Sequence, residues 1–188
     1  NPTAIRGALA DVKHLALGWD ANDTRGFDEA CDREFEYFGA VGLLRWARGL
    51  INVALWDARG RQAGKPVWQL ISGRSEPGRV PVYGSGGWLS YSDDELIAEA
   101  TGYVRRGFTA VKLKVGAREG IARDLERIAK VRSAVGPRIR IMIDANQGLD
   151  LPRALALARQ ARIHGIDWFE EPLVHTDADA RERLADIA

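Results

Sequence analysis

The sequence of 188 residues has few of the residues that make covalent frameworks, because Cys31 is its single cysteine. One cysteine cannot form an intrachain disulfide, so a disulfide-stapled fold is excluded and we expect a reducing, cytoplasmic location. Histidines are also scarce. His14 and His164 fall in predicted helices and are expected to bind no ligand, whereas the role of His175, just after a predicted strand, is left open.

An excess of charge and long apolar runs are also missing. The formal net charge is +1, and basic residues are mixed with acidic ones along the chain. These features give no reason to expect nucleic acid or an anionic membrane as a partner. No apolar run approaches the roughly 20 residues that a membrane-spanning helix needs. The hydrophobic content of 46% is nevertheless enough for a sizeable core.

Residues 1–78 predict helices and no strand. Apolar residues recur three and four positions apart most clearly over residues 41–58, and a helix this apolar is expected to be largely buried. Trp46, Trp56 and Trp68 are accordingly interpreted as core residues. Asp28 is predicted to cap the helix that comes before this segment.

Residues 79–188 show a different, regular pattern in which strands and helices alternate four times. The strands are predicted at residues 80–83, 109–116, 139–144 and 166–170, and each is followed by a helical segment. Repeats of roughly thirty residues are typical of βα units joined by short loops, so we expect a parallel sheet. This alternation alone leaves open a doubly wound sheet and a (β/α)8 barrel.

A doubly wound sheet would favour a nucleotide-binding domain, and residues 84–87 (GSGG) do follow a predicted strand. The third glycine of a dinucleotide-binding fingerprint would, however, fall at Leu89. No acidic residue ends the second strand either. We therefore interpret residues 84–87 as an ordinary loop.

The second predicted strand carries two lysines on one face. Successive side chains of a strand point to opposite faces, so Lys112 and Lys114 share a face that Val111 and Leu113 do not. If this strand is buried, each ammonium group lowers the pKa of the other and burial lowers both, which can create a base. The alternative is an exposed strand whose lysines are simply solvated.

Carboxylates end the next two strands and favour the buried interpretation. Asp144 closes the third strand and Glu170 the fourth, and the carboxyl ends of parallel strands meet at one rim. Ionised carboxylates at the ends of apolar strands should be paired or bound to a metal. Carboxylate oxygens that face a common centre suit a hard cation such as Mg²⁺.

Three segments with these residues resemble a known family. They are residues 111–116 (VKLKVG), 143–146 (IDAN) and 168–172 (WFEEP), spaced about one βα unit apart. Together with residues 54–57 (ALWD) they resemble the mandelate racemase and muconate lactonizing enzyme branch of the enolase superfamily. The resemblance extends over essentially the whole chain.

The resemblance implies a fold for each part. Residues 1–78 would be the helical remainder of an N-terminal α+β capping domain, and residues 79–188 the first four βα units of a TIM-type barrel. Because the family's barrel has eight units, we expect this chain to be an internal portion of a longer protein, truncated at both ends.

The resemblance also implies chemistry, in which a base removes the proton next to a substrate carboxylate and Mg²⁺ stabilises the resulting enediolate. Lys114 matches the base, and Lys112 matches the neighbour that lowers its pKa and contacts the substrate carboxylate. Asp144 and Glu170 match the first two metal ligands. Three more residues are expected to support the site: Asn146 behind the ligands, and Tyr83 and Ser85 as candidate substrate contacts.

The family pattern needs a third carboxylate and a second acid or base from later strands, so the final product stays open. Glu171, whose role is also left open, favours the mandelate racemase side of the family, where acid-sugar dehydratases form a large group. We therefore expect an acid-sugar dehydratase acting on a small carboxylate, homo-oligomeric in the full-length protein. A racemase, epimerase or cycloisomerase is the alternative, and a scaffold or binding segment is the alternative without catalysis.

Overall fold

The computed structural model of the chain describes residues 1–39, 41–174 and 178–185, with the backbone alone described for residues 178–181. The chain divides into two compact units, Asn1–Arg79 and Val80–Ala188. Each unit has its own hydrophobic core and is described by itself.

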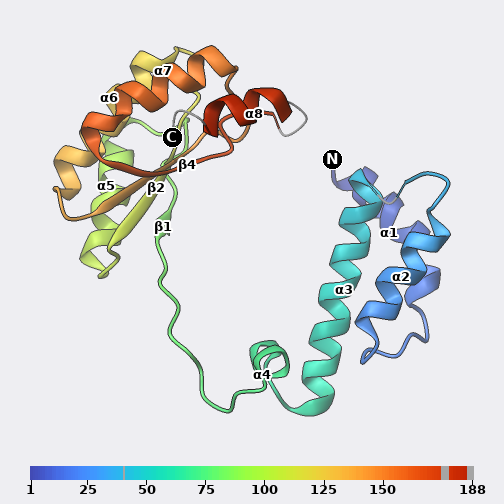
Figure 1. Cartoon of the computed structure of the whole chain (residues 1–188). Helices are drawn as coiled ribbons and strands as arrows, with labels where there is room; N and C mark the ends of the chain where they lie inside the picture. Colours follow the sequence, from blue (N-terminus) through green and yellow to red (C-terminus); the bar gives the residue numbers. More distant parts are fainter. Residues whose placement is uncertain (40, 175–177, 186–188) are drawn as a thin grey trace. The chain divides into compact units, whose positions relative to one another are not determined.

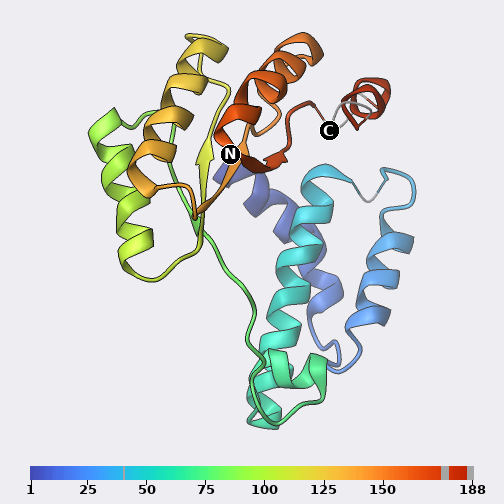
Figure 2. The same ribbon diagram turned by 60° about the vertical axis from the view of Figure 1, so that its left-hand side comes forward.

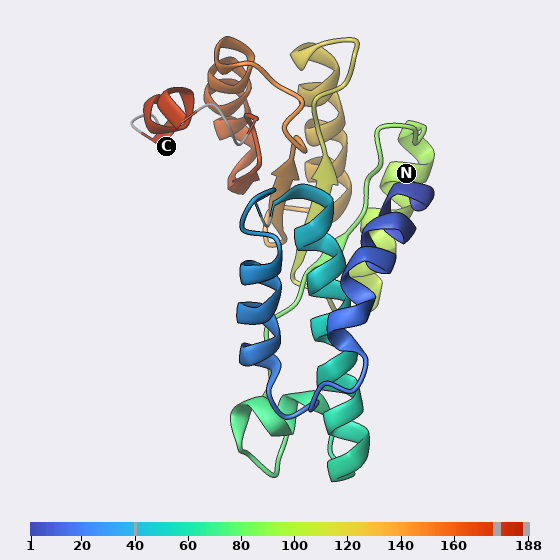
Figure 3. The same ribbon diagram turned by 90° about the vertical axis from the view of Figure 1, so that its right-hand side faces the viewer.

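The first unit contains helices only over its described residues, as predicted. Its helices are α1 (Pro2–Ala16), α2 (Thr24–Glu34), α3 (Gly42–Ala63) and α4 (Val67–Ser72). The first three lie side by side (Figure 3), and their core is built on Val12, Phe27, Cys31 and Ala47. Gly64, in the left-handed conformation, ends α3.

Two predictions for this unit were wrong. Asp23, not Asp28, caps α2, because its side chain accepts a hydrogen bond from the Gly26 amide while Asp28 lies inside the helix. The second concerns α3, which is not largely buried: Trp46 is 67% exposed and Val53 is 67% exposed. Apolar residues surround α3, but α1 and α2 pack against only part of its surface.

The second unit is a four-stranded parallel sheet with helices. Its strands are β1 (Gly84–Ser85), β2 (Ala110–Lys114), β3 (Arg140–Asp144) and β4 (Ile166–Glu170). Its helices are α5 (Asp93–Arg105), α6 (Ile121–Val135), α7 (Leu151–Ala161), the short η1 (Arg162–His164) and α8 (Ala178–Ala185). The alternation of strand and helix predicted from the sequence is confirmed.

The order of the strands decides between the two parallel architectures. The sheet runs β1-β2-β3-β4, so every strand pairs with its neighbours in sequence. Helices α5, α6 and α7 all cover the same face of this sheet (Figures 1 and 2). A doubly wound sheet reverses its strand order and carries helices on both faces, so the arrangement is that of a (β/α) barrel segment.

The first strand lies later than predicted. Residues 80–83 form no strand and are exposed, and the pairing with β2 begins where Gly84 lies opposite Val111. Pro81 has no amide hydrogen to donate to a ladder, which disfavours a strand there. Residues 84–85 are therefore part of the sheet, although residues 84–87 were interpreted as a loop.

The sheet has a helix-facing side and a polar side. Val111, Leu113, Ile141 and Ile143 alternate along β2 and β3 and belong to the core that packs against α5, α6 and α7. The residues between them point the other way, because successive strand side chains alternate. The polar side therefore carries both lysines of β2 and the carboxylate that ends β3.

Side chains and glycines mark the ends of the helices in this unit. Ser92 and Glu95 form a capping box at the start of α5, and the Asp150 side chain caps α7. Gly136 ends α6. None of the helices in the described parts of the chain is long and apolar enough to cross a membrane.

Candidate active site

The strand register brings the predicted site residues into one row. Lys114 lies opposite Asp144, and Asp144 lies opposite Glu170, at the carboxyl ends of β2, β3 and β4. Residues that are level on neighbouring parallel strands point to the same face of a sheet. Lys112 shares this face two residues earlier on β2, so the structure brings together all four charged residues that the sequence singled out.

The four charges form a partly buried network. Lys114 Nζ donates to Asp144 Oδ2 at 2.6 Å, and Lys112 Nζ donates to Glu170 Oε2 at 2.6 Å. Lys112 Nζ is also 3.5 Å from Asp144 Oδ2. The side chain of Asp144 is 2% exposed and that of Lys112 is 8% exposed. Two ammonium groups thus balance two carboxylates, and of these four side chains Glu170 is the most exposed, at 32%.

The pKa of Lys112 was expected to be low, and this prediction was wrong. Burial does favour the neutral amine, but the hydrogen bonds to Glu170 and Tyr83 outweigh it and raise the pKa above its ordinary value. For Asp144, burial favours the neutral acid. The hydrogen bond from Lys114, followed by that from the Asn146 amide, outweighs burial and lowers the pKa of this carboxyl.

An aromatic ring lies beside each lysine. Lys112 Nζ lies 5.3 Å from the centroid of the Tyr83 ring, so Tyr83 is next to the charged residues of the sheet. Lys114 Nζ lies 5.5 Å from the ring of Trp88, a residue that the sequence analysis missed. Its position in the sequence could have indicated this, because Trp88 directly follows Gly86 and Gly87 at the carboxyl end of β1.

Ser85 lies next to Lys112 in the sheet, since the two residues are paired between β1 and β2. Its carbonyl accepts a hydrogen bond from the Tyr103 hydroxyl of α5 at 2.8 Å, which fixes the end of β1. The residue is exposed on the polar side of the sheet. This place is compatible with the expected substrate contact.

Asn146 supports Asp144 directly. Its backbone amide donates to Asp144 Oδ1 at 2.9 Å, and its side-chain amide nitrogen lies 3.4 Å from Oδ2. Asn146, Gln147 and Glu171 all adopt positive φ angles, a conformation that costs free energy and is concentrated at functional sites. The Gln147 amide donates to the Glu171 carbonyl at 2.8 Å, so these strained residues tie the ends of β3 and β4 together. His175 lies outside the described residues.

The carboxylates of Asp144 and Glu170 both lie close to the same ammonium group. The ammonium of Lys112 lies within 3.5 Å of one carboxylate and 2.6 Å of the other, so both already face a shared positive charge. Hard oxygen donors in this arrangement suit Mg²⁺. Over the described ranges, however, no group of three or more acidic, histidine or cysteine side chains could hold a metal ion.

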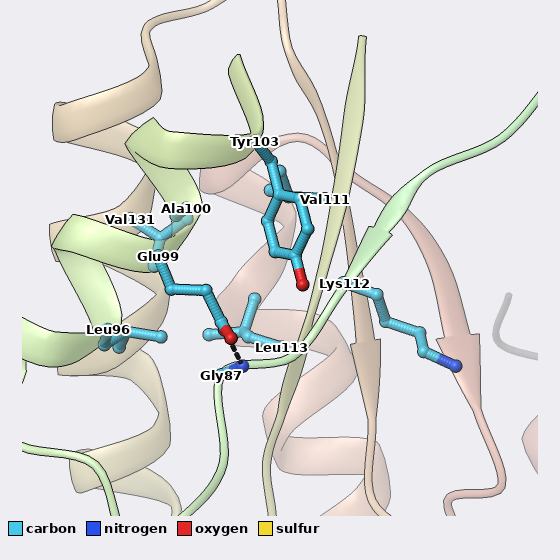
Figure 4. Close-up of a pocket in the computed structure, with 9 residues that line it drawn as sticks. All are labelled: Gly87, Leu96, Glu99, Ala100, Tyr103, Val111, Lys112, Leu113 and Val131. Carbon is cyan, nitrogen blue, oxygen red and sulfur yellow. Dashed lines mark hydrogen bonds between the residues drawn. The ribbon is translucent and has the colours of Figure 1, made fainter. Parts of the chain in front are cut away.

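A small cavity of about 10 Å³ lies on the other side of the sheet, between α5 and β2. Figure 4 shows Glu99 and Tyr103 directed toward it, while the Lys112 side chain extends away from both. Such a volume holds at most one water molecule. This cavity is therefore too small to hold a substrate.

Two families match the chain. Residues 95–188 match the family described as "Enolase C-terminal domain-like", and residues 3–72 match the N-terminal domain of mandelate racemase and muconate lactonizing enzyme. The chain belongs to the mandelate racemase and muconate lactonizing enzyme branch of the enolase superfamily. The superfamily resemblance inferred from the three strand-end motifs is thereby confirmed.

Relatives within this branch include sugar-acid enzymes. The chain is 39% identical over 149 residues to D-galactarolactone cycloisomerase of Agrobacterium fabrum, an alignment that covers 78% of the chain and 39% of that enzyme. The structure of 3,6-anhydro-D-galactonate cycloisomerase from Zobellia galactanivorans matches with a TM-score of 0.88 and 33% identity, covering 99% of the chain and 51% of that enzyme.

A third match has a metal and a ligand. L-Talarate dehydratase from Polaromonas sp. JS666, in complex with Mg and L-glucarate, matches with a TM-score of 0.83 and 30% identity, over 97% of the chain and 51% of that enzyme. The chain therefore spans about half the length of these solved enolase-superfamily enzymes.

Proposed function

We propose that the full-length protein uses this site to remove the proton next to a substrate carboxylate. The observation that carries the proposal is the row Lys114, Asp144 and Glu170, which places a lysine beside two carboxylates at the strand ends. Lys114 takes the proton from the α-carbon. Lys112, the other ammonium on this face, holds the substrate carboxylate and balances its negative charge.

Asp144 and Glu170 are proposed to hold Mg²⁺, with Asn146 orienting Asp144 through its two hydrogen bonds. Bound there, Mg²⁺ would act as a Lewis acid and stabilise the negative charge that develops on the substrate. Lys112, which lies beside Tyr83 and is paired with Ser85 across the sheet, would bind the substrate carboxylate.

The substrate is proposed to be a sugar acid, and the reaction a dehydration. The similarity to L-talarate dehydratase with bound Mg and L-glucarate supports this proposal. Cycloisomerisation is the second candidate, because the 39% identical relative is a cycloisomerase. Both reactions, and the racemisation considered above, share the removal of the α-proton and differ in the step that follows it.

The remaining assignments are part of the same proposal. The helical first unit would belong to the capping domain and the second unit to the first half of the barrel. The enzyme is proposed to be a cytoplasmic homo-oligomer. A scaffold without catalysis is disfavoured, because well-packed apolar residues at the positions of Lys112 and Asp144 would avoid the cost of burying these charges.

Exchange of the α-proton with solvent deuterium tests the proposed function. The full-length protein, with Mg²⁺ and a panel of sugar acids in D2O, should incorporate deuterium at the α-carbon, and Lys114→Ala should reduce this exchange by about 10²-fold or more. Lys130→Ala, which removes a lysine of α6 distant from the row, is the control. Undiminished exchange in Lys114→Ala would mean that another residue is the base.

A further inference from the structure

Trp88 lies beside Lys114 but has no role in the reaction proposed above. The side chain is 55% exposed although it is a large apolar ring, and its ring centroid is 5.5 Å from Lys114 Nζ. A substrate α-carbon must come within about 3–4 Å of that nitrogen to lose its proton. A substrate carbon chain bound there would therefore reach the indole.

We propose that Trp88 is a specificity-determining wall of the substrate site, which packs against the C–H groups of the substrate chain beside Lys114. We further propose that Arg127 and Glu99 are positioning residues that hold this wall in place. The substrate-contact part rests on the proposed function; the positioning part rests on the contacts of the segment 86–91 alone.

Arg127 of α6 holds this segment through three carbonyl groups. Its side chain is almost fully buried, and Nη2 donates to the carbonyls of Gly87 and Trp88, both at 2.9 Å. Nη1 donates to the carbonyl of Tyr91 at 3.3 Å. A buried guanidinium that binds carbonyls instead of a carboxylate is expensive, and Nε has no hydrogen-bond partner among the described residues.

Glu99 of α5 holds the same segment from the other side. Its Oε2 accepts a hydrogen bond from the Gly87 amide at 2.6 Å (Figure 4), and its Oε1 lies 3.4 Å from the Tyr91 hydroxyl. The backbone of Gly87 is therefore bound on both sides of its Cα, by Glu99 at the amide and by Arg127 at the carbonyl.

Gly87 is also connected directly to the proposed base. Its carbonyl accepts a hydrogen bond from the Lys114 amide at 3.1 Å. This one residue thus links Glu99 of α5 and Arg127 of α6 to the backbone of Lys114, and the next residue along the chain is Trp88. Loss of Arg127 would free the Trp88 carbonyl and let the indole leave the ammonium of Lys114.

Chemical labelling tests the positioning without a substrate. In the full-length protein, the acetylation rate of Lys114 by trace acetic anhydride would be measured by peptide mass spectrometry, relative to exposed Lys65. Trp88→Ala and Arg127→Met should each raise the Lys114 rate about three- to tenfold, because the ring no longer covers the amine. Arg127→Lys keeps a hydrogen-bond donor, so its Lys114 acetylation rate should lie between the rates of these variants and that of the wild type.

Arg123→Met is the matched control, since Arg123 is also on α6 but binds Asp93 and Glu126. It should leave the Lys114 rate unchanged. Trp88→Ala tests the wall even if Arg127→Met does not fold, because an exposed ring can be removed without emptying the core. An unchanged acetylation rate of Lys114 in both Trp88→Ala and Arg127→Lys would contradict the proposal that Arg127 holds Trp88 over this amine.

Kinetics test the substrate contact. With a sugar acid whose α-proton the wild type exchanges, Trp88→Ala should raise KM about tenfold and change kcat much less, and Trp88→Phe should restore KM. An unchanged KM in Trp88→Ala would overturn the contact and leave the proposed reaction standing. If the wild type exchanges no sugar acid, the proposed reaction and the substrate contact both fail, and labelling alone decides the positioning.

Discussion

Individual charges at the strand ends compensate one another. Lys114 pairs with Asp144, and Lys112 with Glu170, so no charge of this row is left buried and alone. An isolated buried charge would cost several kcal/mol. If Asp144 and Glu170 hold Mg²⁺ as proposed, the cation competes with the Lys112 ammonium for these two carboxylates.

This competition gives a prediction for metal binding by the full-length protein. Glu170→Gln keeps the shape of the side chain but removes its charge, and should raise the Mg²⁺ concentration needed for half-maximal thermal stabilisation about tenfold. Asp144→Asn should act in the same direction. Asp167→Asn, at the opposite end of β4, is the control, and an equal Mg²⁺ requirement in all variants would refute the assignment of the ligands.

Gly87 shows how a single residue without a side chain can be essential. Its φ is +63°, and a Cβ would lie 2.5 Å from Leu113 Cβ and 2.9 Å from Leu113 Cα. Gly87→Ala must therefore push apart the segment after β1 and the strand that carries Lys114. Neither segment moves easily, because Leu113 is in the core and both the amide and the carbonyl of Gly87 are hydrogen-bonded.

Two glycine variants distinguish the cost of a strained backbone from the cost of a steric clash. Gly107→Ala replaces a glycine with φ of +89° and open space around it, and should cost about 1 kcal/mol of unfolding free energy. Gly87→Ala should cost about 2 kcal/mol more, because overpacking adds to the strained backbone. Denaturant unfolding of the full-length variants measures both, and equal losses would show that the segment near Gly87 can shift.

At the scale of elements, α5 and α6 are joined by a cluster of charges at the start of α5. Asp93 accepts hydrogen bonds from Lys130 Nζ at 2.5 Å and Arg123 Nη2 at 2.8 Å. The hydrogen bond from Lys130, followed by that from Arg123, lowers the Asp93 pKa to about 2. The cluster lies on the outer side of the helices that support the segment carrying Trp88.

The pH dependence of stability follows from this shift. In the folded state Asp93 stays ionised down to about pH 2, whereas in the unfolded chain it becomes protonated near its ordinary pKa of 3.8. Its stabilising contribution is therefore present above about pH 4 and is lost as the pH falls toward 2. Asp93→Asn should lower Tm by about two degrees at pH 6, and by much less at pH 2.

Asp94→Asn serves as the control, since it removes a neighbouring acidic residue from the same helix turn. Thermal unfolding of the full-length protein across this pH range measures both variants. A difference between wild type and Asp93→Asn that grows toward low pH would contradict the assigned ion pairs.

At the scale of the whole molecule, the chain consists of two compact units joined by an exposed segment. Residues 71–83 are all exposed, and residues 73–83 form neither helix nor strand. Exposed segments without regular structure are preferred sites of proteolysis. This segment contains two trypsin sites, Arg74 and Arg79.

Limited trypsin digestion of the full-length protein should therefore cut first after Arg74 or Arg79. Mass spectrometry of the early fragments identifies the site. Replacing both arginines with glutamine should remove the early cut without changing Tm. A first cut inside α3, which also contains arginines, would contradict the division into these two units.

The sequence alone determined the elements whose causes are local. The alternation of β2, α6, β3, α7 and β4 follows from apolar periodicity, and the capping residues Ser92 and Asp150 mark the helix starts. The residues Lys112, Lys114, Asp144 and Glu170 could be singled out because polar side chains at the ends of apolar strands are unusual. Their motifs also identified the superfamily.

Only the tertiary structure decided features that depend on contacts between distant segments. β1 lies at Gly84–Ser85 because close packing of Gly84 against Tyr103 and of Gly87 against Leu113 sets its pairing with β2. The Lys112 pKa is raised because Glu170 lies beside it, 58 residues later in the chain. Trp88 became a site residue for the same reason, since Arg127 and Glu99 bring its segment to Lys114. Side-chain types record local preferences, whereas distances between charges and rings exist only after the sheet has formed.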